Sequence, residues 1–404
     1  MDSAETTTPR PWWHDRALLG VIGGTALVLL ALAAQVDVLD EAHRNWNKPW
    51  DHQKYRHMAD HPLELRLSPF GWRVLGPLLV TVIPVANDLA FRIVSLTALG
   101  GTAVVVFLLG RRAGFSDAAA ACGSFVYLGT WWSTGYLVYN PWLPDALTFL
   151  IVGLLALLAL DRRGWQFAVL LAVGVLVKEQ VLLVVPLWWT LSRRPWSWRP
   201  LLQAGALLVP ALFVMACVRA GLPAENADPG HASDLGLELN AYDRLPQDQQ
   251  ILFEKFGRER LRSFPGEIRD WTAGVFGVWP LLGLVDWRRC GSVLLRWSPF
   301  LVGVYAQPLM ASNTHRLVAL AFPVAMLLVA GGVDRLRTAG LLSGWGAIAI
   351  GAAGAGVALV RPNVSAPWWL ALAIVGAVLA VEAVARHLTR AAGPGPVDRS
   401  AEQV

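Results

Sequence analysis

The chain has 404 residues, of which 55% are hydrophobic and only 16% are charged, and its mean hydropathy is +0.46. Soluble globular proteins carry about 25% charged residues, so this composition excludes an ordinary soluble domain and indicates an integral membrane protein. The net charge of +5 comes from basic residues in short connectors between apolar runs, a pattern that indicates membrane orientation rather than nucleic-acid binding.

Apolar runs follow one another along most of the chain, and about 20 apolar residues suffice for a helix to cross a bilayer. The predicted spans are 17–36, 91–110, 117–134, 145–160, 166–178, 180–191, 200–218, 271–286, 292–309, 317–333, 340–360 and 367–385. The fifth and sixth are short. Two half-length helices that meet at Lys178–Glu179 give twelve spans, and one span with a buried charge pair gives eleven. The prediction is therefore an all-α polytopic membrane protein with about 11–12 transmembrane helices.

Basic residues cluster in alternate connectors, and short loops rich in Lys and Arg face the cytoplasm. With twelve spans, both termini and every basic cluster fall on the cytoplasmic side. The clusters are Arg111–Arg112, Arg162–Arg163, Arg193–Arg194, Arg288–Arg289, Arg335 with Arg337, and Arg386 with Arg390. The predicted organisation is a cytoplasmic tail over 1–16, one membrane domain over 17–391 and a disordered cytoplasmic tail over 392–404.

Two long outer loops are predicted, over 37–90 and 219–270. Within the first, residues 73–87 are apolar but few, and they include Pro77 and Pro84. Counting this stretch as a span would invert every later loop and place the basic clusters outside. We therefore expect an interfacial or re-entrant helix on the outer face.

Six charged residues border or interrupt the apolar runs on this predicted outer side. A charge at the centre of a membrane helix costs at least about 2.5 kcal/mol, so such residues usually lie in a protein cavity and have a function. Three of them are cations that suit an anion such as a lipid phosphate, because arginine offers a bidentate fork and lysine a point charge. For any one cation alone, a snorkelling membrane anchor is the alternative. The six are Asp51, Arg73, Asp145, Lys178, Glu179 and Arg316.

The acidic members have competing interpretations. Asp51 lies four residues before Tyr55, so a helix would place both on one face, and its carboxylate suits a general base acting on a hydroxyl. The alternative is a solvated loop carboxylate, and Asp37, Asp40 and Glu41, just after the first span, compete for the role of base. Asp145 follows a proline-rich segment, which also fits a helix N-cap.

Glu179 adjoins Lys178, so a simple neutralising pair is the alternative for these two. The sequence has no P-loop, GxSxG, GxGxxG or HExxH motif, so nucleotide-driven and serine-hydrolase mechanisms lack their usual residues. The three cysteines show no CxxC or Cys/His spacing, and neither a disulfide framework nor a zinc site is predicted.

Five short sequence motifs follow one another along the chain. D-x-x-x-Y-x-x-x-A begins at Asp51 and P-F-x-x-R-x-L-x-P-L-L at Pro69. D-A-L begins at Asp145, a K-E pair at Lys178, and N-x-x-R at Asn313. Together with the order of spans over about residues 17–333, this series resembles the class C membrane glycosyltransferases (GT-C fold), particularly bacterial members tied to cell-surface polysaccharide.

The resemblance implies a GT-C-like fold with an outer juxtamembrane helix after the first span, and an inverting transferase in the bacterial cytoplasmic (inner) membrane. It would move a sugar from a polyprenyl-phosphate donor to a glycan or lipid acceptor on the extracytoplasmic face, amid membrane lipid and without nucleic acid. Asp51 would be the general base, and Arg73, Lys178 and Arg316 would bind the donor phosphate. The implied supporting residues are Tyr55, Asp145, Glu179 and Asn313.

Two features depart from the family. Its members often carry two acidic residues at the site, and here Asp40 and Glu41 lie off the pattern, while loop 219–270 has no family motif. No cofactor is called for: a divalent metal would require Asp51 to share it with another carboxylate, and no ligand spacing demands one.

Other functions also fit a charged membrane protein. A transporter or lipid flippase would ordinarily have its charges deeper in the spans, together with repeat symmetry. A non-catalytic scaffold of a polysaccharide assembly complex would tolerate loss of Asp51. An enzyme that uses a lipid-diphosphate donor is a nearer neighbour.

Overall fold

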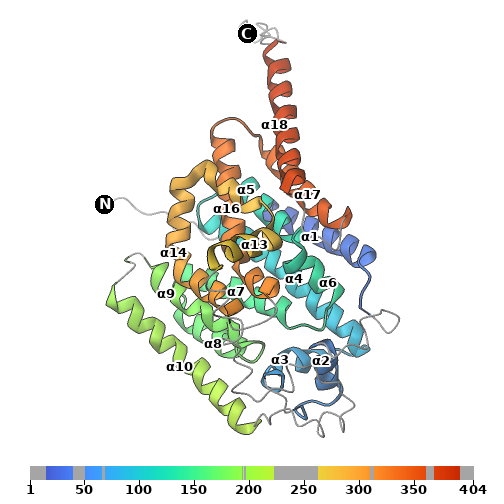
Figure 1. Cartoon of the computed structure of the whole chain (residues 1–404), viewed down its shortest axis with the longest axis vertical. Helices are drawn as coiled ribbons and strands as arrows, with labels where there is room; N and C mark the ends of the chain where they lie inside the picture. The colour runs from blue at the N-terminus through green and yellow to red at the C-terminus, as the bar shows by residue number, and fades with distance from the viewer. Residues whose placement is uncertain are drawn as a thin grey trace, which may run out of the picture.

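The computed structural model describes residues 15–39, 51–65, 69–192, 194, 197–222, 263–309, 314–360 and 368–391. Every regular element within these ranges is helical (Figure 1). Five helices are long and apolar enough to span a membrane: Arg16–Gln35, Asn87–Arg112, Trp198–Gly221, Thr314–Thr338 and Leu370–His387. The described chain is thus all-helical, and its apolar helices indicate a membrane protein, as the sequence predicts.

The elements follow the predicted order. The first third comprises α1 (Arg16–Gln35), α2 (Asp51–Asp60), η2 (Phe70–Trp72), α3 (Leu75–Thr81), α4 (Asn87–Arg112), α5 (Asp117–Leu128), η3 (Trp131–Gly135) and α6 (Tyr136–Tyr139). The middle comprises α7 (Asp145–Leu160), α8 (Gly164–Gly174), η4 (Glu179–Val184), α9 (Val185–Thr190) and α10 (Trp198–Gly221). The last part comprises α13 (Phe264–Phe276), η6 (Trp279–Asp286), α14 (Trp287–Ala306), η7 (Gln307–Leu309), α15 (Thr314–Val318), η8 (Ala319–Ala321), α16 (Phe322–Thr338), α17 (Gly344–Val360) and α18 (Trp368–Ala391).

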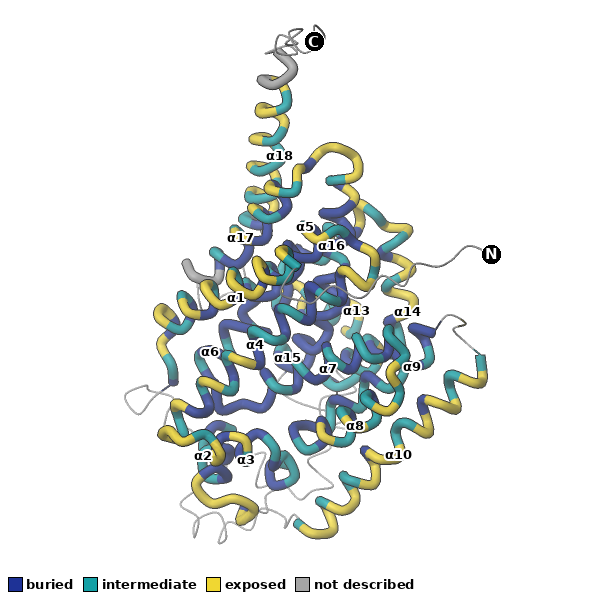
Figure 2. The backbone as a smooth tube through the Cα atoms, turned by 180° about the vertical axis from the view of Figure 1, so that it is seen from behind, coloured by how far each residue is buried: buried dark blue, intermediate teal, exposed yellow. Residues whose placement is uncertain are grey.

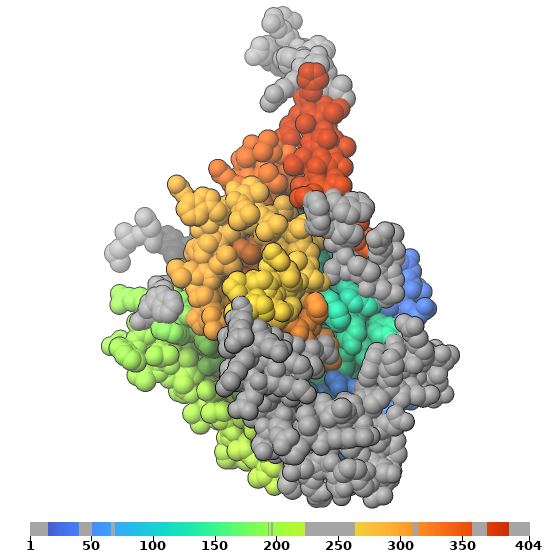
Figure 3. All heavy atoms as spheres, viewed as in Figure 1, coloured from blue at the N-terminus to red at the C-terminus, as the bar shows by residue number. Residues whose placement is uncertain are grey.

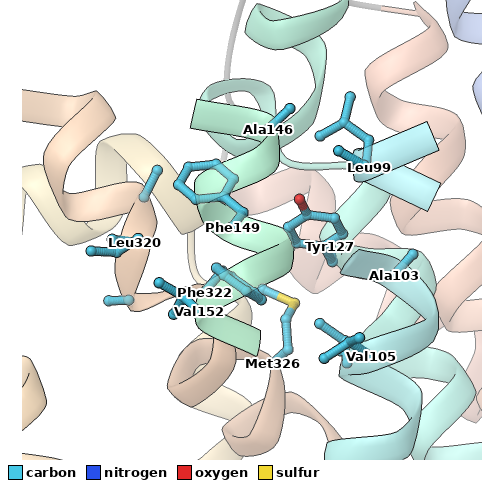
Figure 4. Packing of buried hydrophobic residues seen from close by; sticks show 14 of the residues in the cluster. Leu99, Ala103, Val105, Tyr127, Ala146, Phe149, Val152, Leu320, Phe322 and Met326 are labelled. Carbon is cyan, nitrogen blue, oxygen red and sulfur yellow. The ribbon is translucent and has the colours of Figure 1, made fainter. Parts of the chain in front are cut away.

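The core lies where α4, α5, α7 and α16 meet (Figure 4). The ring of Phe322 lies 5.3 Å from that of Tyr127 and 5.5 Å from that of Phe149. Small residues allow close helix contacts, as is usual in membrane bundles. A Cβ on Gly129 would lie 2.2 Å from the carbonyl oxygen of Gly354, so α5 and α17 meet backbone to backbone.

The outer helices present apolar side chains to the surroundings. Figure 2 shows α10 and α18 largely exposed, whereas much of α5 and α16 is buried. Leu202 and Phe213 of α10 are among the exposed apolar residues. Such faces are compatible with lipid contact, because a helix satisfies its own backbone hydrogen bonds without water.

The chain reverses direction at Lys178–Glu179. At the open end of this hairpin, the rings of Phe167 and Trp188 lie 5.4 Å apart, and Arg162 donates to the carbonyl of Trp188. Near the apex, Gly174 packs against Val181. Lys178 itself is extended, with φ −166° and ψ 133°. Of the two alternatives predicted for this region, two short helical segments that meet at the charged pair are the arrangement found.

Several predicted spans are not continuous α-helices. The span over 117–134 ends as a helix at Leu128, and a π-helical turn, η3, follows. The span over 271–286 breaks at Gly277, whose φ of 61° disfavours other residues, and continues as the 3₁₀ helix η6. The span over 317–333 begins as α15 and η8 before α16, which has Pro323 in its first turn.

The basic connectors converge at one end of the bundle. Arg112 at the end of α4 lies 3.1 Å from Asp161 after α7, and Arg289 of α14 lies 3.2 Å from Asp334 of α16. Arg289 also donates to the carbonyl of Ala113 at 2.9 Å. The other end of α4, which begins at Asn87, contacts α2 and α3 instead, so these two helices lie at the end of the bundle away from the basic connectors.

Parts of the predicted organisation lie outside the described residues. They include the tail residues 1–14 and 392–404, and residues 40–50 and 223–262 of the outer loops. The competing acids Asp40 and Glu41, and the supporting residue Asn313, lie there as well.

Candidate functional site

Helix α2 carries Asp51 as its first residue and is tied to the start of α4. Arg56 makes two bonds to Asp88, Nε to Oδ1 at 2.9 Å and Nη2 to Oδ2 at 3.2 Å. One turn further on, the side-chain amide of Asn87 donates to Asp60 at 2.7 Å. These charge-assisted bonds set the position of α2 and hence of Asp51. Asp51 and Tyr55 both lie on α2, four residues apart, so they share a face of this helix.

Arg73 joins the first outer loop to the apex of the α8–α9 hairpin. Its guanidinium donates to Glu179 twice, Nη2 to Oε1 at 2.5 Å and Nε to Oε2 at 3.2 Å. The remaining nitrogen, Nη1, donates to the hydroxyl of Tyr55 at 3.2 Å. The hypothesis that Glu179 neutralises Lys178 is therefore wrong, because its carboxylate forks onto Arg73.

Asp145 is held between two cations. Lys178 Nζ donates to its Oδ1 at 2.8 Å, and Arg316 Nη2 donates to its Oδ2 at 2.6 Å. The N-cap interpretation of Asp145 is wrong, since Pro144 occupies the cap position and Asp145 is the first residue of α7. Both carboxylate oxygens serve the ion network instead.

Arg316 links this buried pair to α2. Its Nη1 donates to Asp51 Oδ2 at 3.1 Å, so one guanidinium bridges two carboxylates that come from different helices. The six charged residues noted in the sequence therefore meet at one end of the bundle, with Tyr55 among them. We call Asp51, Tyr55, Arg73, Asp145, Lys178, Glu179 and Arg316 the charged network.

The network has a buried inner part and an accessible rim. The side chains of Asp145, Lys178 and Arg316 are 3%, 5% and 9% exposed. By contrast, Asp51 is 30% exposed and Glu179 is 40% exposed. Removing one partner of a buried ion pair typically destabilises the fold by about 3–5 kcal/mol, so each charge of the inner part depends on its partners. The rim carboxylates are the ones that can meet a ligand.

Electrostatics keep Asp51 ionised. Burial alone would raise the pKa of its carboxyl, but the positive charges of Arg316 and Lys54 outweigh burial and hold that pKa below its ordinary value. For Tyr55, burial raises the pKa of the hydroxyl above its ordinary value, so the phenol stays protonated at neutral pH. Asp51 can therefore accept a proton, and Tyr55 serves as a neutral hydrogen-bonding group.

The structure adds residues that the sequence reasoning missed. Lys54 is 1% exposed, and its ammonium lies 4.2 Å from the centre of the Phe70 ring. Its place three residues after Asp51 on a helix was a signal that could have been used. Tyr136 lies within electrostatic range of Arg316 and Asp51, and nothing in its sequence surroundings marks it.

Among the described residues, no three His, Cys, Asp or Glu side chains gather closely enough to hold a metal ion. The described carboxylates of the network have arginine or lysine partners instead. Neither a protein-family model nor a curated protein matches the chain.

Proposed function

We propose that this chain is a membrane glycosyltransferase of the GT-C type. It would transfer a sugar from a polyprenyl-phosphate carrier to a hydroxyl of a glycan or lipid acceptor on the outer face of the cytoplasmic membrane. The observation that carries the proposal is the Arg316 bridge: one guanidinium is anchored on buried Asp145 and also contacts the accessible carboxylate of Asp51. A cation and a base are thereby held side by side at the rim.

The bridge fits a single displacement with inversion. The acceptor oxygen would attack the anomeric carbon while Asp51 takes its proton, and the bond from that carbon to the phosphate oxygen would break. The carrier phosphate leaves with the bonding electron pair and gains one negative charge. Arg316, Arg73 and Lys178 would stabilise that charge, and Asp145 and Glu179 would orient the three cations.

The same contact would regulate the base. In the free protein, Arg316 holds Asp51 in its weakly basic form. An anionic phosphate that shares Arg316 would draw positive charge away from Asp51 and bring its own negative charge close, so the pKa of Asp51 would rise. Asp51 would thus become a better base when the donor is bound.

The placement of the network supports a lipid-borne substrate. Helix α7 starts at Asp145 and has 16 residues. Its length is therefore about 24 Å, shorter than the roughly 30 Å of a bilayer's hydrocarbon. The network would lie in a depression that a carrier lipid can reach. Since basic loops face the cytoplasm, its position opposite the basic end supports an extracytoplasmic site.

The test is turnover of labelled polyprenyl-phosphate sugars by proteoliposomes, with acceptor supplied by membrane extract that supports transfer in native membranes. Asp51→Asn should lower the rate about 10²-fold or more, since general bases contribute about 10²–10⁴. Asp60→Asn is the matched control, because Asp60 lies exposed at the end of the same helix and asparagine keeps an oxygen that can accept the hydrogen bond from Asn87. Lack of turnover of every donor by the unchanged protein would overturn the proposal, and equal rates in the Asp51 and Asp60 variants would remove Asp51 as the base.

A further inference from the structure

A π-helical turn stands beside the charged network. Residues Trp131–Gly135 form it, between α5 and the short helix α6. A Cβ on Gly135, its last residue, would lie 2.4 Å from the Trp131 ring, so a larger residue there would force this ring to move. π-turns are rare and are frequent at functional sites, since the extra residue redirects the side chains around it.

The turn presents a row of half-buried aromatic rings. Trp132 stacks on His315, with centroids 5.0 Å apart and planes at 15°, and lies 5.1 Å from the ring of Tyr136. Tyr136 in turn lies 6.1 Å from Tyr139. His315 directly precedes Arg316, so the row adjoins the charged network. We call Trp132, Tyr136, Tyr139 and His315 the aromatic row.

The row is near the surface rather than in the core. His315 packs against α13 where Gly274 leaves space, since a Cβ there would lie 2.8 Å from its Nε2. Figure 3 shows α13 in yellow beside the teal surface of the segment that includes α6. Helix α13 also contacts η3 and α15, so the three elements frame one region.

Two buried polar atoms next to the row have no hydrogen-bond partner among the described residues. They are Arg316 Nε, whose residue is 8% exposed, and Asn140 Oδ1, whose residue is 2% exposed. The Tyr136 side chain interacts with both Arg316 and Asn140. Within the described part of the chain, a donor and an acceptor beside this phenol therefore have no partner, and such buried groups require one.

We infer that the aromatic row, Arg316 Nε and Asn140 Oδ1 form a binding subsite for a sugar ring. Sugar hydroxyls both donate and accept, so one can accept from Arg316 Nε–H and another can donate to Asn140 Oδ1. The apolar C–H face of the ring packs on an aromatic side chain, here Trp132 or Tyr136. The inference rests on the proposed function, which supplies two sources for such a ring, the donor and the acceptor.

Binding to the nanodisc-held chain tests the inference without catalysis. The donor probes are citronellyl phosphate and its glucose, galactose, mannose and arabinose esters. The acceptor probes are the octyl glycosides of the same sugars. At least one sugar ester should bind unchanged protein about tenfold tighter than citronellyl phosphate, or one octyl glycoside should bind measurably. Trp132→Ala and Asn140→Leu should abolish that sugar-dependent affinity.

Controls separate a sugar contact from damage to the fold. Citronellyl phosphate should bind the Trp132→Ala protein as it binds the unchanged one, and Trp345→Ala, which alters an 83% exposed tryptophan, should change nothing. Trp132→Phe, which keeps an aromatic face, should retain part of the sugar affinity. Loss confined to the esters assigns the subsite to the donor, and loss confined to the glycosides assigns it to the acceptor.

Absence of sugar-dependent binding by the unchanged protein, or equal loss for all probes in the Trp132→Ala protein, would overturn the subsite. Sugar binding that depends on Trp132, in a protein that turns over no donor, would instead retain the subsite and remove the transferase proposal. The two failures are therefore distinguishable.

Discussion

Arg316 donates a hydrogen bond to Asp51 across 3.1 Å, although the two residues lie 265 positions apart in the chain. The guanidinium is not free to move, because its other terminal nitrogen is bound to Asp145. The carboxylate of Asp51 at the rim thus contacts a cation that the buried inner part of the network holds in place. Under the proposed function, this arrangement would be pre-organised for a transfer in which a proton leaves the acceptor as negative charge develops on the donor phosphate.

The bridge requires the planar fork of arginine. Lysine at position 316 would keep the positive charge but could not reach Asp51 and Asp145 with the same geometry. Arg316→Lys should therefore lower the transfer rate about 10²-fold or more, measured with labelled donor in proteoliposomes. Arg269→Lys, at a 78% exposed arginine of α13, should leave the rate unchanged. A rate within about threefold of the original in the Arg316→Lys protein would remove the bridge from the mechanism.

Substitutions in the buried inner part of the network should have strongly coupled effects on stability. Asp145→Leu leaves Lys178 as an uncompensated buried charge, so we expect a loss of about 3–5 kcal/mol in the free energy of unfolding. Asp145→Leu combined with Lys178→Met should recover much of that loss, because both charges are gone. Chemical denaturation in detergent micelles measures both values. Additive destabilisation in the double variant would contradict the pairing seen here.

The rate should fall with acid only at low pH. The folded pKa of Asp51 lies below its ordinary 3.8, so its carboxylate stays ionised down to that region, and kcat/KM should decline only as pH falls through the lowered pKa. Its contribution to stability has the same sign, being present above pH 3.8 and lost as pH falls further.

Removing a cation near Asp51 should raise the pH at which kcat/KM begins to fall on the acid side of the profile (the acid limb). Lys54→Met removes one of the charges that lowers the pKa of Asp51, so the acid limb of kcat/KM should move to higher pH. Arg269→Gln, which removes an exposed charge elsewhere, should leave the limb in place. An unmoved limb in the Lys54→Met protein would show that another group controls the profile.

The contact between α5 and α17 should not tolerate a side chain at Gly129. Its φ of −81° suits any residue, so the cost of Gly129→Val is steric and comes from the nearby carbonyl of Gly354. We expect a loss of about 1–3 kcal/mol or more in unfolding free energy. Gly356→Val on α17, where nothing lies within 4 Å of the added Cβ, is the control. Equal stability of the two variants would contradict this packing.

The two ends of the bundle should react with an impermeant maleimide from opposite sides. In a protein with Cys217→Ser, which removes the exposed cysteine, Asp60→Cys should label in intact spheroplasts. Arg163→Cys, at the basic end, should label only after the membrane is broken. Labelling of both in intact cells, or the reverse pattern, would contradict the proposed orientation.

Much of the helical layout can be predicted from the sequence. Apolar runs and basic connectors are local properties, and they correctly anticipate an all-helical chain with membrane-spanning helices and the turn at Lys178–Glu179. Of the 11–12 predicted spans, five correspond, within the described residues, to helices that are long and apolar enough to cross a membrane. The interruptions are harder to foresee. The π-turn at Trp131–Gly135 depends on contacts with other helices, while Gly277 is one glycine among 37 and nothing local marks it as a break.

The sequence by itself determined that charged residues border the apolar runs, because the cost of a charge in hydrocarbon makes each one conspicuous. Only the tertiary structure decided the partners. Glu179 pairs with Arg73 rather than with its neighbour Lys178, and Asp145 binds Lys178 and Arg316 rather than capping its helix. It also brought in Lys54, Tyr136 and Asn140. Such choices depend on distances between side chains from separate helices, and those distances exist only once the bundle is packed.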